Sequence, residues 1–402
     1  LINHPLDCPI CDQGGECELQ DLAVGYGNSS SRYAEDKRVV FEKYLGPLIS
    51  AKEMTRCIQC TRCVRFGQEI AGVMELGMIG RSEHAEIVSF VGKTVDSELS
   101  GNMIDVCPVG ALTSKPFRYQ ARTWELSRRK SVSPHDALGS NLVVQVKGDT
   151  VMRVLPLENE AINECWLSDR DRFSYEALNS DERLTEPMIR RAGVDGSSAW
   201  QAVDWQTALE HVAKGLGDVV HKHGGGALGA LCAPYATTEE LALAARLVRA
   251  LGSDNIDYRL RQSDFRGDGQ GAGIAWLGMP IAELQTLDRV LVVGSFLRKD
   301  HPLLAQRLRL AAKHGTKLCV VNPIDDDWLM PIAGKAIAQP SQMPRLLAEI
   351  VVACAAKSGA TLPPALANIE ASPPAQAIAD TLGSGKNTAI LLGNLAEQHR
   401  DA

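Results

Sequence analysis

The chain has 402 residues, more than a single hydrophobic core usually organises, so we expect two or more domains. Its hydrophobic content of 45%, charged content of 23% and net charge of −7 are typical of a globular protein and exclude a strongly basic nucleic-acid-binding chain. No run of about 18 or more apolar residues occurs, so the sequence predicts no membrane-spanning helix. The chain begins at Leu1 rather than at Met, and we expect a fragment that lacks part of its N-terminal and C-terminal sequence.

The cysteines are concentrated near the start of the chain. There are 11 of them, an odd number, and seven fall within the first 107 residues in tight groups. The remaining four are scattered: Cys165, Cys232, Cys319 and Cys354. Clustering of this kind in a long chain of ordinary composition favours metal sites over disulfides.

The opening stretch, HPLDCPICDQGGEC, carries one histidine and three cysteines in fourteen residues. The candidate ligands are His4, Cys8, Cys11 and Cys17. Prolines and paired glycines in this stretch disfavour a helix and predict a loop, which can wrap four side chains around one centre. Zinc would accept this ligand set, and so would a cubane iron–sulfur cluster with one imidazole ligand. The motif alone does not decide between the two.

A second group reads TRCIQCTRC, and a later cysteine stands in DVCPVGAL. The candidate ligands are Cys57, Cys60, Cys63 and Cys107. The Cys-x2-Cys-x2-Cys spacing followed by a Cys-Pro pair is the ferredoxin arrangement for a [4Fe–4S] cluster. We expect Pro108 to start a helix, since its missing N–H costs nothing there. The flanking Arg56, Arg62 and Arg65 would offset the negative charge of the cluster.

These three stretches resemble the large iron–sulfur subunit of respiratory complex I, NADH:quinone oxidoreductase, which is called the G subunit in bacteria and the 75 kDa subunit in mitochondria. The resemblance covers essentially the whole chain. It implies one [4Fe–4S] cluster on His4, Cys8, Cys11 and Cys17. It implies a second on Cys57, Cys60, Cys63 and Cys107. It further implies a [2Fe–2S] domain that would precede Leu1.

The function implied by the resemblance is the transfer of single electrons from the NADH- and flavin-binding subunit toward quinone. No catalytic residue is expected on this chain, although it would be part of an oxidoreductase and translocase. Its partners would be other complex I subunits, with no nucleic acid and no direct membrane span. It would lie in a peripheral arm at the cytoplasmic face of the bacterial plasma membrane, or on the matrix side of the inner membrane in mitochondria. The alternatives are a subunit of an NAD-linked formate dehydrogenase or of an NAD-reducing hydrogenase, and a zinc-stabilised structural module.

Some members of this family carry a further cluster after residue 125, and the matching positions here lack cysteine. They hold Ser133, Asp136, Ser140 and Ser168. None of these side chains supplies a thiolate, so we predict no cluster there. We expect surface or packing roles for the neighbouring His135 and Cys165. The stretch NLVVQVKGDTVMRVLP predicts two strands joined at residues 147–149.

From about residue 200 helical and strand patterns alternate, which predicts an α/β fold with a mainly parallel sheet. Helices are expected in DWQTALEHVAKGLGDVVHKHG (with Asp204 as N-cap), TTEELALAARLVRALG and LLAQRLRLAAKHG. Strands are expected in ALGALCAPY, DRVLVVGSFL and TKLCVVNP. We expect residues 355–387, which are rich in Ala, Pro, Ser and Gly, to form a surface excursion.

This region resembles the molybdopterin oxidoreductases. Where formate dehydrogenases carry a catalytic cysteine and histidine, the chain has Ser263 and Asp264, so we expect an inactive scaffold without molybdopterin. We therefore divide the chain into three domains. Residues 1–122 would form the iron–sulfur domain, which is α+β. Residues 123–185 would form a small β-rich domain without cluster cysteines. Residues 186–402 would form a truncated molybdopterin-oxidoreductase-like α/β domain.

Overall fold

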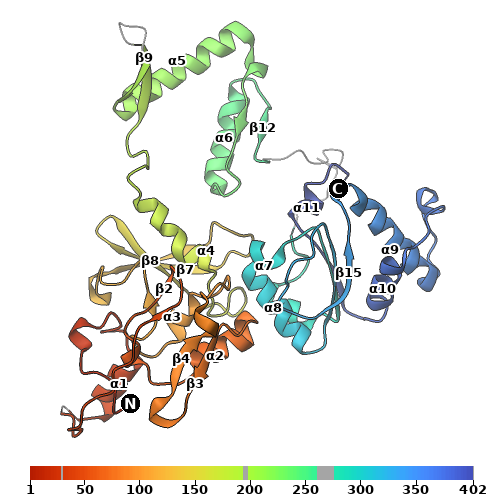
Figure 1. Ribbon diagram of the computed structural model, residues 1–402. Helices are drawn as coiled ribbons and strands as arrows, with labels where there is room; N and C mark the ends of the chain where they lie inside the picture. The colour runs from red at the N-terminus through yellow and green to blue at the C-terminus, as the bar shows by residue number, and fades with distance from the viewer. Residues whose placement is uncertain (29, 193–197, 260–275, 402) are drawn as a thin grey trace. The chain divides into compact units, whose positions relative to one another are not determined.

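The structure is a computed structural model that describes all residues except 29, 193–197, 260–275 and 402 (Figure 1). Two compact units can be distinguished. The first consists of Leu1–Glu176 together with Asp264–Ala402, and the second of Ala177–Ser263. Ser263 and Asp264, which we singled out as the positions of a lost catalytic pair, lie outside the described residues. No described helix is both long enough and apolar enough to cross a bilayer.

The cysteine-rich part of the first unit is built from short elements joined by loops. Its helices are α1 (Glu18–Tyr26), α2 (Arg62–Phe66) and α3 (Asn102–Val106). An antiparallel sheet is formed by β1 (Lys43–Tyr44), β2 (Ile49–Ala51) and β5 (Thr113–Ser114). A separate hairpin is formed by β3 (Leu76–Ile79) and β4 (Glu86–Ser89). Because regular elements are few, most of the candidate ligands lie outside α-helices and strands, and Cys63 in α2 is an exception.

The Cys-Pro pair ends a helix instead of starting one. Helix α3 stops at Val106, and Cys107 follows in an extended conformation. A residue that precedes proline is disfavoured in the helical conformation because of the proline ring, so the helix must end before Pro108. The expectation that Pro108 begins a helix is therefore wrong.

A three-stranded antiparallel sheet follows in the first unit. It contains β6 (Ser127–Val132), β7 (Asn141–Lys147) and β8 (Thr150–Pro156). Strands β7 and β8 meet at Gly148, whose φ of 58° suits glycine, so the two predicted strands and their turn are confirmed. The short helix α4 (Asp169–Phe173) begins at Ser168, whose hydroxyl accepts a hydrogen bond from the backbone N–H of Asp171.

The C-terminal part of the first unit holds an all-parallel sheet in the order β15-β14-β13-β16, which confirms the predicted sheet type. Its strands are β13 (Arg289–Val293), β14 (Lys317–Asn322), β15 (Ile332–Ile337) and β16 (Thr388–Leu392). Its helices are α7 (Leu297–Asp300), α8 (Pro302–Lys313), α9 (Met343–Ser358), α10 (Pro373–Leu382) and α11 (Asn394–Glu397). Helices connect β13 to β14 and β15 to β16, as parallel strands usually require, whereas a loop over residues 323–331 joins β14 to β15.

The expectation of a surface excursion over 355–387 is wrong for helix α10. Its residues Ala375, Ile378 and Ala379 are fully buried in the core beside the sheet. The prolines at the start of the helix are compatible with its first turn, and its small alanines allow close packing. The Ala- and Pro-rich composition of this segment is therefore that of a packed helix with prolines in its first turn, and not that of a surface loop.

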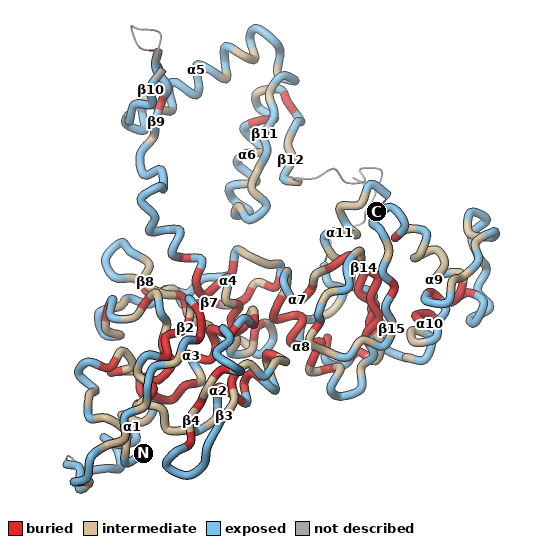
Figure 2. Tube along the Cα trace, viewed as in Figure 1, coloured by how far each residue is buried: buried red, intermediate tan, exposed pale blue. Residues whose placement is uncertain are grey.

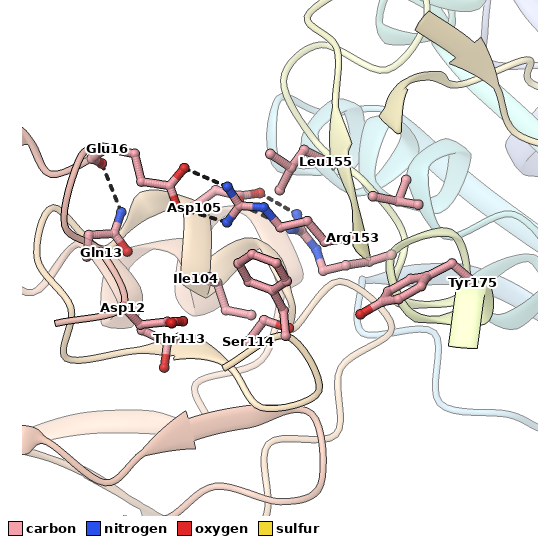
Figure 3. A pocket seen from close by; sticks show the side chains of 13 residues that line it. Asp12, Gln13, Glu16, Ile104, Asp105, Thr113, Ser114, Arg153, Leu155 and Tyr175 are labelled. Atoms are coloured by element: carbon pink, nitrogen blue, oxygen red, sulfur yellow. Dashed lines mark hydrogen bonds and ion pairs between the residues drawn. The ribbon is translucent and has the colours of Figure 1, made fainter. Parts of the chain in front are cut away.

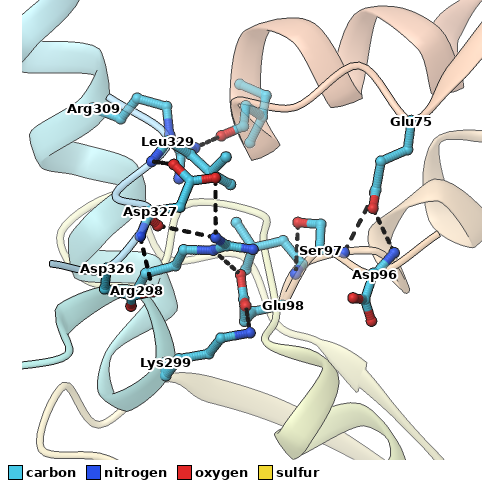
Figure 4. Close-up of polar contacts among 12 residues, drawn as sticks. Glu75, Asp96, Ser97, Glu98, Arg298, Lys299, Arg309, Asp326, Asp327 and Leu329 are labelled. Carbon is cyan, nitrogen blue, oxygen red and sulfur yellow. Dashed lines mark hydrogen bonds and ion pairs between the residues drawn. The ribbon is translucent and has the colours of Figure 1, made fainter. Parts of the chain in front are cut away.

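Helices α7 and α8 join the two parts of the first unit. Leu303 and Leu308 of α8 share one hydrophobic core with Leu76 and Met103 of the cysteine-rich part, and Figure 2 shows this buried material continuing from one part into the other. Polar contacts surround the core (Figure 4). Arg298 binds Glu98 at 2.8 Å, and the buried Arg309 donates to the carbonyl of Ile70. The first unit is thus held together by both apolar packing and ion pairs.

The second unit contains a hairpin of β9 (Met188–Ala192) and β10 (Ser198–Ala202), helices α5 (Trp205–His223) and α6 (Thr238–Ala250), and a parallel pair of β11 (Ala230–Leu231) and β12 (Ile256–Asp257). Asp204 caps α5 by accepting from the backbone N–H of Thr207, so both predicted helices and this cap are confirmed. The strand expected in ALGALCAPY is reduced to two residues.

Candidate cluster-binding sites

The second cysteine group and the distant Cys-Pro pair meet in space. Cys57, Cys60, Cys63 and Cys107 all line one small pocket. The remaining lining residues are Met54, Ile58, Thr61, Ile87, Val109, Ala111 and Leu112. Apart from one threonine, these neighbours are apolar, and Cys63 and Cys107 are buried, whereas Cys57 is half-buried and Cys60 is exposed. Four sulfurs in an apolar pocket suit a cluster whose ligands are thiolates.

Local backbone geometry brings the three closely spaced cysteines to this pocket. Gln59 and Thr61 have φ values of 50° and 61°, in the left-handed region that non-glycine residues rarely adopt. Left-handed residues between successive cysteines turn the chain sharply, and helix α2 then begins at Arg62. On the other wall, the Cys107 thiol donates to the carbonyl of Val109 at 3.0 Å.

The pocket disfavours free thiolates. Burial, together with the neighbouring cysteines, raises the pKa of Cys57 to about 11 and that of Cys63 to about 12. Burial also raises the pKa of Cys107. An isolated negative charge is costly in such surroundings, whereas iron would neutralise it, so cluster binding and loss of the thiol protons are coupled at this site.

The opening motif forms a loop with one 3-10 turn over Cys8–Ile10, as its prolines and glycines predict. Cys11 and Cys17 are buried, while Cys8 is exposed. Cys17 caps helix α1 through a hydrogen bond from the backbone N–H of Gln20 to its sulfur at 3.4 Å. The Nδ1 atom of His4 is buried and has no hydrogen-bond partner in the part of the chain that the structure describes. A buried nitrogen without a partner fits a metal ligand.

The segment that follows Cys107, called the border segment below, lies between the two sets of candidate ligands and contacts cysteines of the opening motif. The Cys17 thiol lies 3.5 Å from the carbonyl of Pro108. At Gly110, a Cβ atom would lie 2.3 Å from the sulfur of Cys11, closer than any real contact. Only glycine can therefore occupy position 110 while Cys11 keeps its place. No sequence motif identified this requirement.

The described residues contain no group of three or more His, Cys, Asp or Glu side chains close enough together to bind a single metal ion. A [4Fe–4S] cluster makes a different demand, because each of its four protein ligands binds a different iron atom. Such ligands surround a larger body and stand further apart than the ligands of one ion. The apolar pocket of four cysteines and the unpartnered His4 nitrogen fit this demand.

The arginines that flank the second group differ in their surroundings. Arg56 is buried and contacts Asp7, whereas Arg62 is exposed and pairs with Glu18 at 2.9 Å, and Arg65 is exposed.

The opening loop is also held against β8, beside a cavity of about 180 Å³ (Figure 3). There Arg153 forms two hydrogen bonds with Glu16, at 2.8 and 2.6 Å. Glu16 lies within the opening motif, but its pairing with the distant Arg153 was missed in the sequence.

Comparison with known proteins assigns the family. The molybdopterin oxidoreductase family matches residues 183–401, more than half of the chain. The chain belongs to the molybdopterin oxidoreductase family. Three further families match the N-terminal half: the NADH-ubiquinone oxidoreductase-G iron-sulfur binding region over 1–32, the ferredoxin-like domain of NADH-quinone oxidoreductase subunit 3 over 46–113, and the NDSU1/NuoG-like 4Fe-4S domain of NADH-ubiquinone oxidoreductase over 126–176.

Individual relatives agree with these matches. The G subunit of NADH-quinone oxidoreductase from Rickettsia felis is 45% identical over 79% of this chain and 45% of its own length. The mitochondrial iron-sulfur protein 1 of NADH dehydrogenase (ubiquinone) from Solanum tuberosum is 44% identical over 81% of this chain and 43% of its own length. The resemblance to the large iron–sulfur subunit of complex I is thereby confirmed. The chain spans about half the length of the curated relatives it matches.

A weaker likeness exists among solved structures. Acetylene hydratase from Pelobacter acetylenicus has a TM-score of 0.47 and 14% identity, over 67% of this chain and 40% of that chain.

Within the segment that matches the NDSU1/NuoG-like 4Fe-4S domain, two of the four non-cysteine positions, Ser133 and Ser168, form a hydrogen-bonded polar site around Asp171. The buried Asp171 carboxylate accepts from the hydroxyls of Ser133 and Ser168, at 2.5 and 2.9 Å. The backbone N–H of Ser133 donates to the carbonyl of Ser140 at 2.9 Å, and burial raises the pKa of Asp136. The Ser140 hydroxyl and the Oδ2 atom of Asp136 are buried without a partner among the described residues, so the polar site is only partly satisfied. The absence of a cluster there stays a prediction, which rests on the lack of thiolates.

Two other residues that we considered near this site have separate surroundings. The Nε2 atom of His135 lies 2.7 Å from the hydroxyl of Ser174. Cys165 is exposed. Neither side chain joins the group around Asp171.

Proposed function

We propose that this chain is an electron-transfer subunit of NADH-quinone oxidoreductase that carries single electrons on two [4Fe–4S] clusters from the NADH- and flavin-binding subunit toward quinone. The proposal rests chiefly on the convergence of four cysteines from two distant segments on one apolar pocket. The names of the relatives support the reaction class, since they are subunits of this oxidoreductase.

The roles of the residues follow from their surroundings. Cys57, Cys60, Cys63 and Cys107 would hold one cluster in their largely apolar pocket. His4, Cys8, Cys11 and Cys17 would hold the other. When bound, the clusters supply one-electron redox chemistry, and the protein fixes their spacing and surroundings. No residue of the chain is assigned acid–base or nucleophilic work in this function.

The remaining assignments are also part of this proposal. A [2Fe–2S] cluster would be carried by sequence preceding Leu1, and the molybdopterin-oxidoreductase-like region would bind no molybdopterin. The domains would be 1–122, 123–185 and 186–402, divisions that lie near the ends of the family matches. The partners would be other peripheral-arm subunits. The arm would face the bacterial cytoplasm, or the matrix in mitochondria.

The decisive experiment is a measurement of iron, acid-labile sulfide, zinc and molybdenum in protein purified without oxygen. Two cubanes predict about eight iron and eight sulfide per chain, with negligible molybdenum. Stoichiometric zinc without sulfide would instead indicate a structural metal module. Stoichiometric molybdenum would move the function of the C-terminal region to catalysis.

A further inference from the structure

One ion pair, between the buried Arg56 and the partly exposed Asp7, connects the two candidate cluster sites. Arg56 directly precedes Cys57 of the second set, and its side chain is only 3% exposed. Its Nε and Nη2 atoms donate to the Oδ2 atom of Asp7, at 3.0 and 2.6 Å. Asp7 directly precedes Cys8 of the opening set. Each partner of the pair is therefore bonded in sequence to a candidate ligand of a different cluster.

The same arginine also contacts the border segment. Its Nη1 atom lies 3.5 Å from the carbonyl of Gly110. A Cβ placed at Gly110 would be 2.3 Å from the Cys11 sulfur and 3.6 Å from the Cδ atom of Arg56. The Cys11 sulfur and the stem of the arginine therefore lie against the same glycine. The guanidinium is close enough to lower the pKa of Cys11, which burial otherwise raises.

The other arginine pair of this region provides a contrast. Arg62 and Glu18 are 46% and 59% exposed, so water and salt screen their charges. The Arg56 charge is buried, and in surroundings of low dielectric constant a charge acts more strongly on its neighbours. Two ion pairs thus occupy similar positions in the sequence, but only one is placed to influence the clusters.

We infer that the Arg56–Asp7 pair is an electrostatic bridge that sets the reduction potentials of both clusters, with Arg56 raising and Asp7 lowering them. This inference rests on the proposed function. Reduction adds one negative charge to a cluster, and a nearby guanidinium favours that state while a nearby carboxylate opposes it. When an electron passes between the clusters, one is oxidised and the other reduced by one electron. The ion pair exchanges no proton or bond in that step.

The test uses the full-length subunit assembled in its complex, with redox titrations followed by electron paramagnetic resonance and with iron and sulfide measured in every sample. Arg56→Gln is expected to shift the midpoint potentials of both clusters downward. Asp7→Asn is expected to shift them upward, and the double variant should lie between the two single variants. The matched control Arg62→Gln is expected to leave both potentials unchanged.

Opposite shifts in the two single variants would support the bridge, because a purely structural role would not produce shifts of opposite sign. Shifts of the same sign, or unchanged potentials with full iron content, would overturn it. If Arg56→Gln loses iron, Asp7→Asn decides alone: an upward shift supports the bridge, and no shift or a downward shift overturns it. Absence of clusters from the unsubstituted protein would instead refute the proposed function, so the two failures are distinguishable.

Discussion

The pocket of four cysteines and the polar site around Asp171 differ in what their side chains bind. In the first, Cys57, Cys60, Cys63 and Cys107 face each other among apolar residues. In the second, Ser133 and Ser168 donate to the buried carboxylate of Asp171. The cysteine pocket offers four sulfurs to a ligand, whereas the polar site uses two of its three serine hydroxyls in bonds to Asp171 and leaves the buried Ser140 hydroxyl without a partner among the described residues.

The difference teaches that replacing cluster ligands requires more than removing sulfur. A buried hydroxyl without a partner is costly, and Asp171 supplies the acceptor that two serines need. The cysteine pocket needs no such acceptor, because thiols are weak hydrogen-bond donors. A cluster site and its polar replacement are therefore stabilised by different kinds of interaction, and mutations should affect them differently.

The largest effect is expected from Cys60→Ala. Removal of one thiolate from the cysteine pocket should abolish its cluster, so iron should fall from about eight to about four per chain. Iron analysis together with electron paramagnetic resonance measures this loss. Cys165→Ala, at an exposed cysteine outside both sets, is the control and should retain all iron. Retention of eight iron in Cys60→Ala would show that the pocket is not a cluster site.

A second loss is expected at the opening loop from Gly110→Ala. The added methyl group would overlap the sulfur of Cys11, so the cluster of the opening motif should be lost while the other signal remains. Electron paramagnetic resonance distinguishes the two signals. Gly217→Ala is the matched control, since nothing lies within 4 Å of a Cβ at that position. A normal pair of signals in Gly110→Ala would contradict the close approach of the two loops.

The polar site should respond through stability instead of iron content. Asp171→Ala leaves two buried hydroxyls without their acceptor and should lower the free energy of unfolding by about 3 kcal/mol. Denaturant unfolding measures the change, and iron per folded chain should stay constant. Asp181→Ala, at an exposed position, should have little effect. A loss of iron in Asp171→Ala with unchanged stability would overturn the distinction between the two sites.

The smallest effect is a pH dependence confined to the cysteine pocket. In cluster-free protein, burial keeps Cys63 protonated up to a pKa of about 12, against 9.0 for an accessible thiol. The unfolded chain then binds fewer protons than the folded chain between these values, so stability should fall as pH rises from about 9 to about 12. The slope per thiol should be at most about 1.4 kcal/mol per pH unit.

Comparison with Cys63→Ala isolates this contribution. The variant should show a shallower decline of unfolding free energy over the same pH range, because one of the titrating groups has been removed. Equal slopes in the two proteins would mean that the Cys63 thiol is not buried in the folded, cluster-free chain.

The sequence alone determined the candidate ligands, the family and the element types. Cysteine spacing is a local property, and the alternation of helix and strand patterns predicted the parallel sheet of β13 to β16. Capping was also local, since Asp204 marked the start of α5. The prediction failed at Pro108 because it overlooked a local rule, that the proline ring disfavours a helical residue before it. It failed over 355–387 because the burial of an alanine-rich helix depends on what the segment packs against.

Only the tertiary structure decided how these pieces meet. Gly110 is required because a loop more than ninety residues away places Cys11 against it, and no spacing rule contains that contact. Asp171 and the Arg56–Asp7 pair likewise gain their roles from neighbours that are distant in sequence. Short motifs identify the candidate ligands because the capacity of a thiolate or an imidazole to bind metal belongs to the side chain itself. The burial, charge and close contacts that surround those ligands arise only when separate segments pack together.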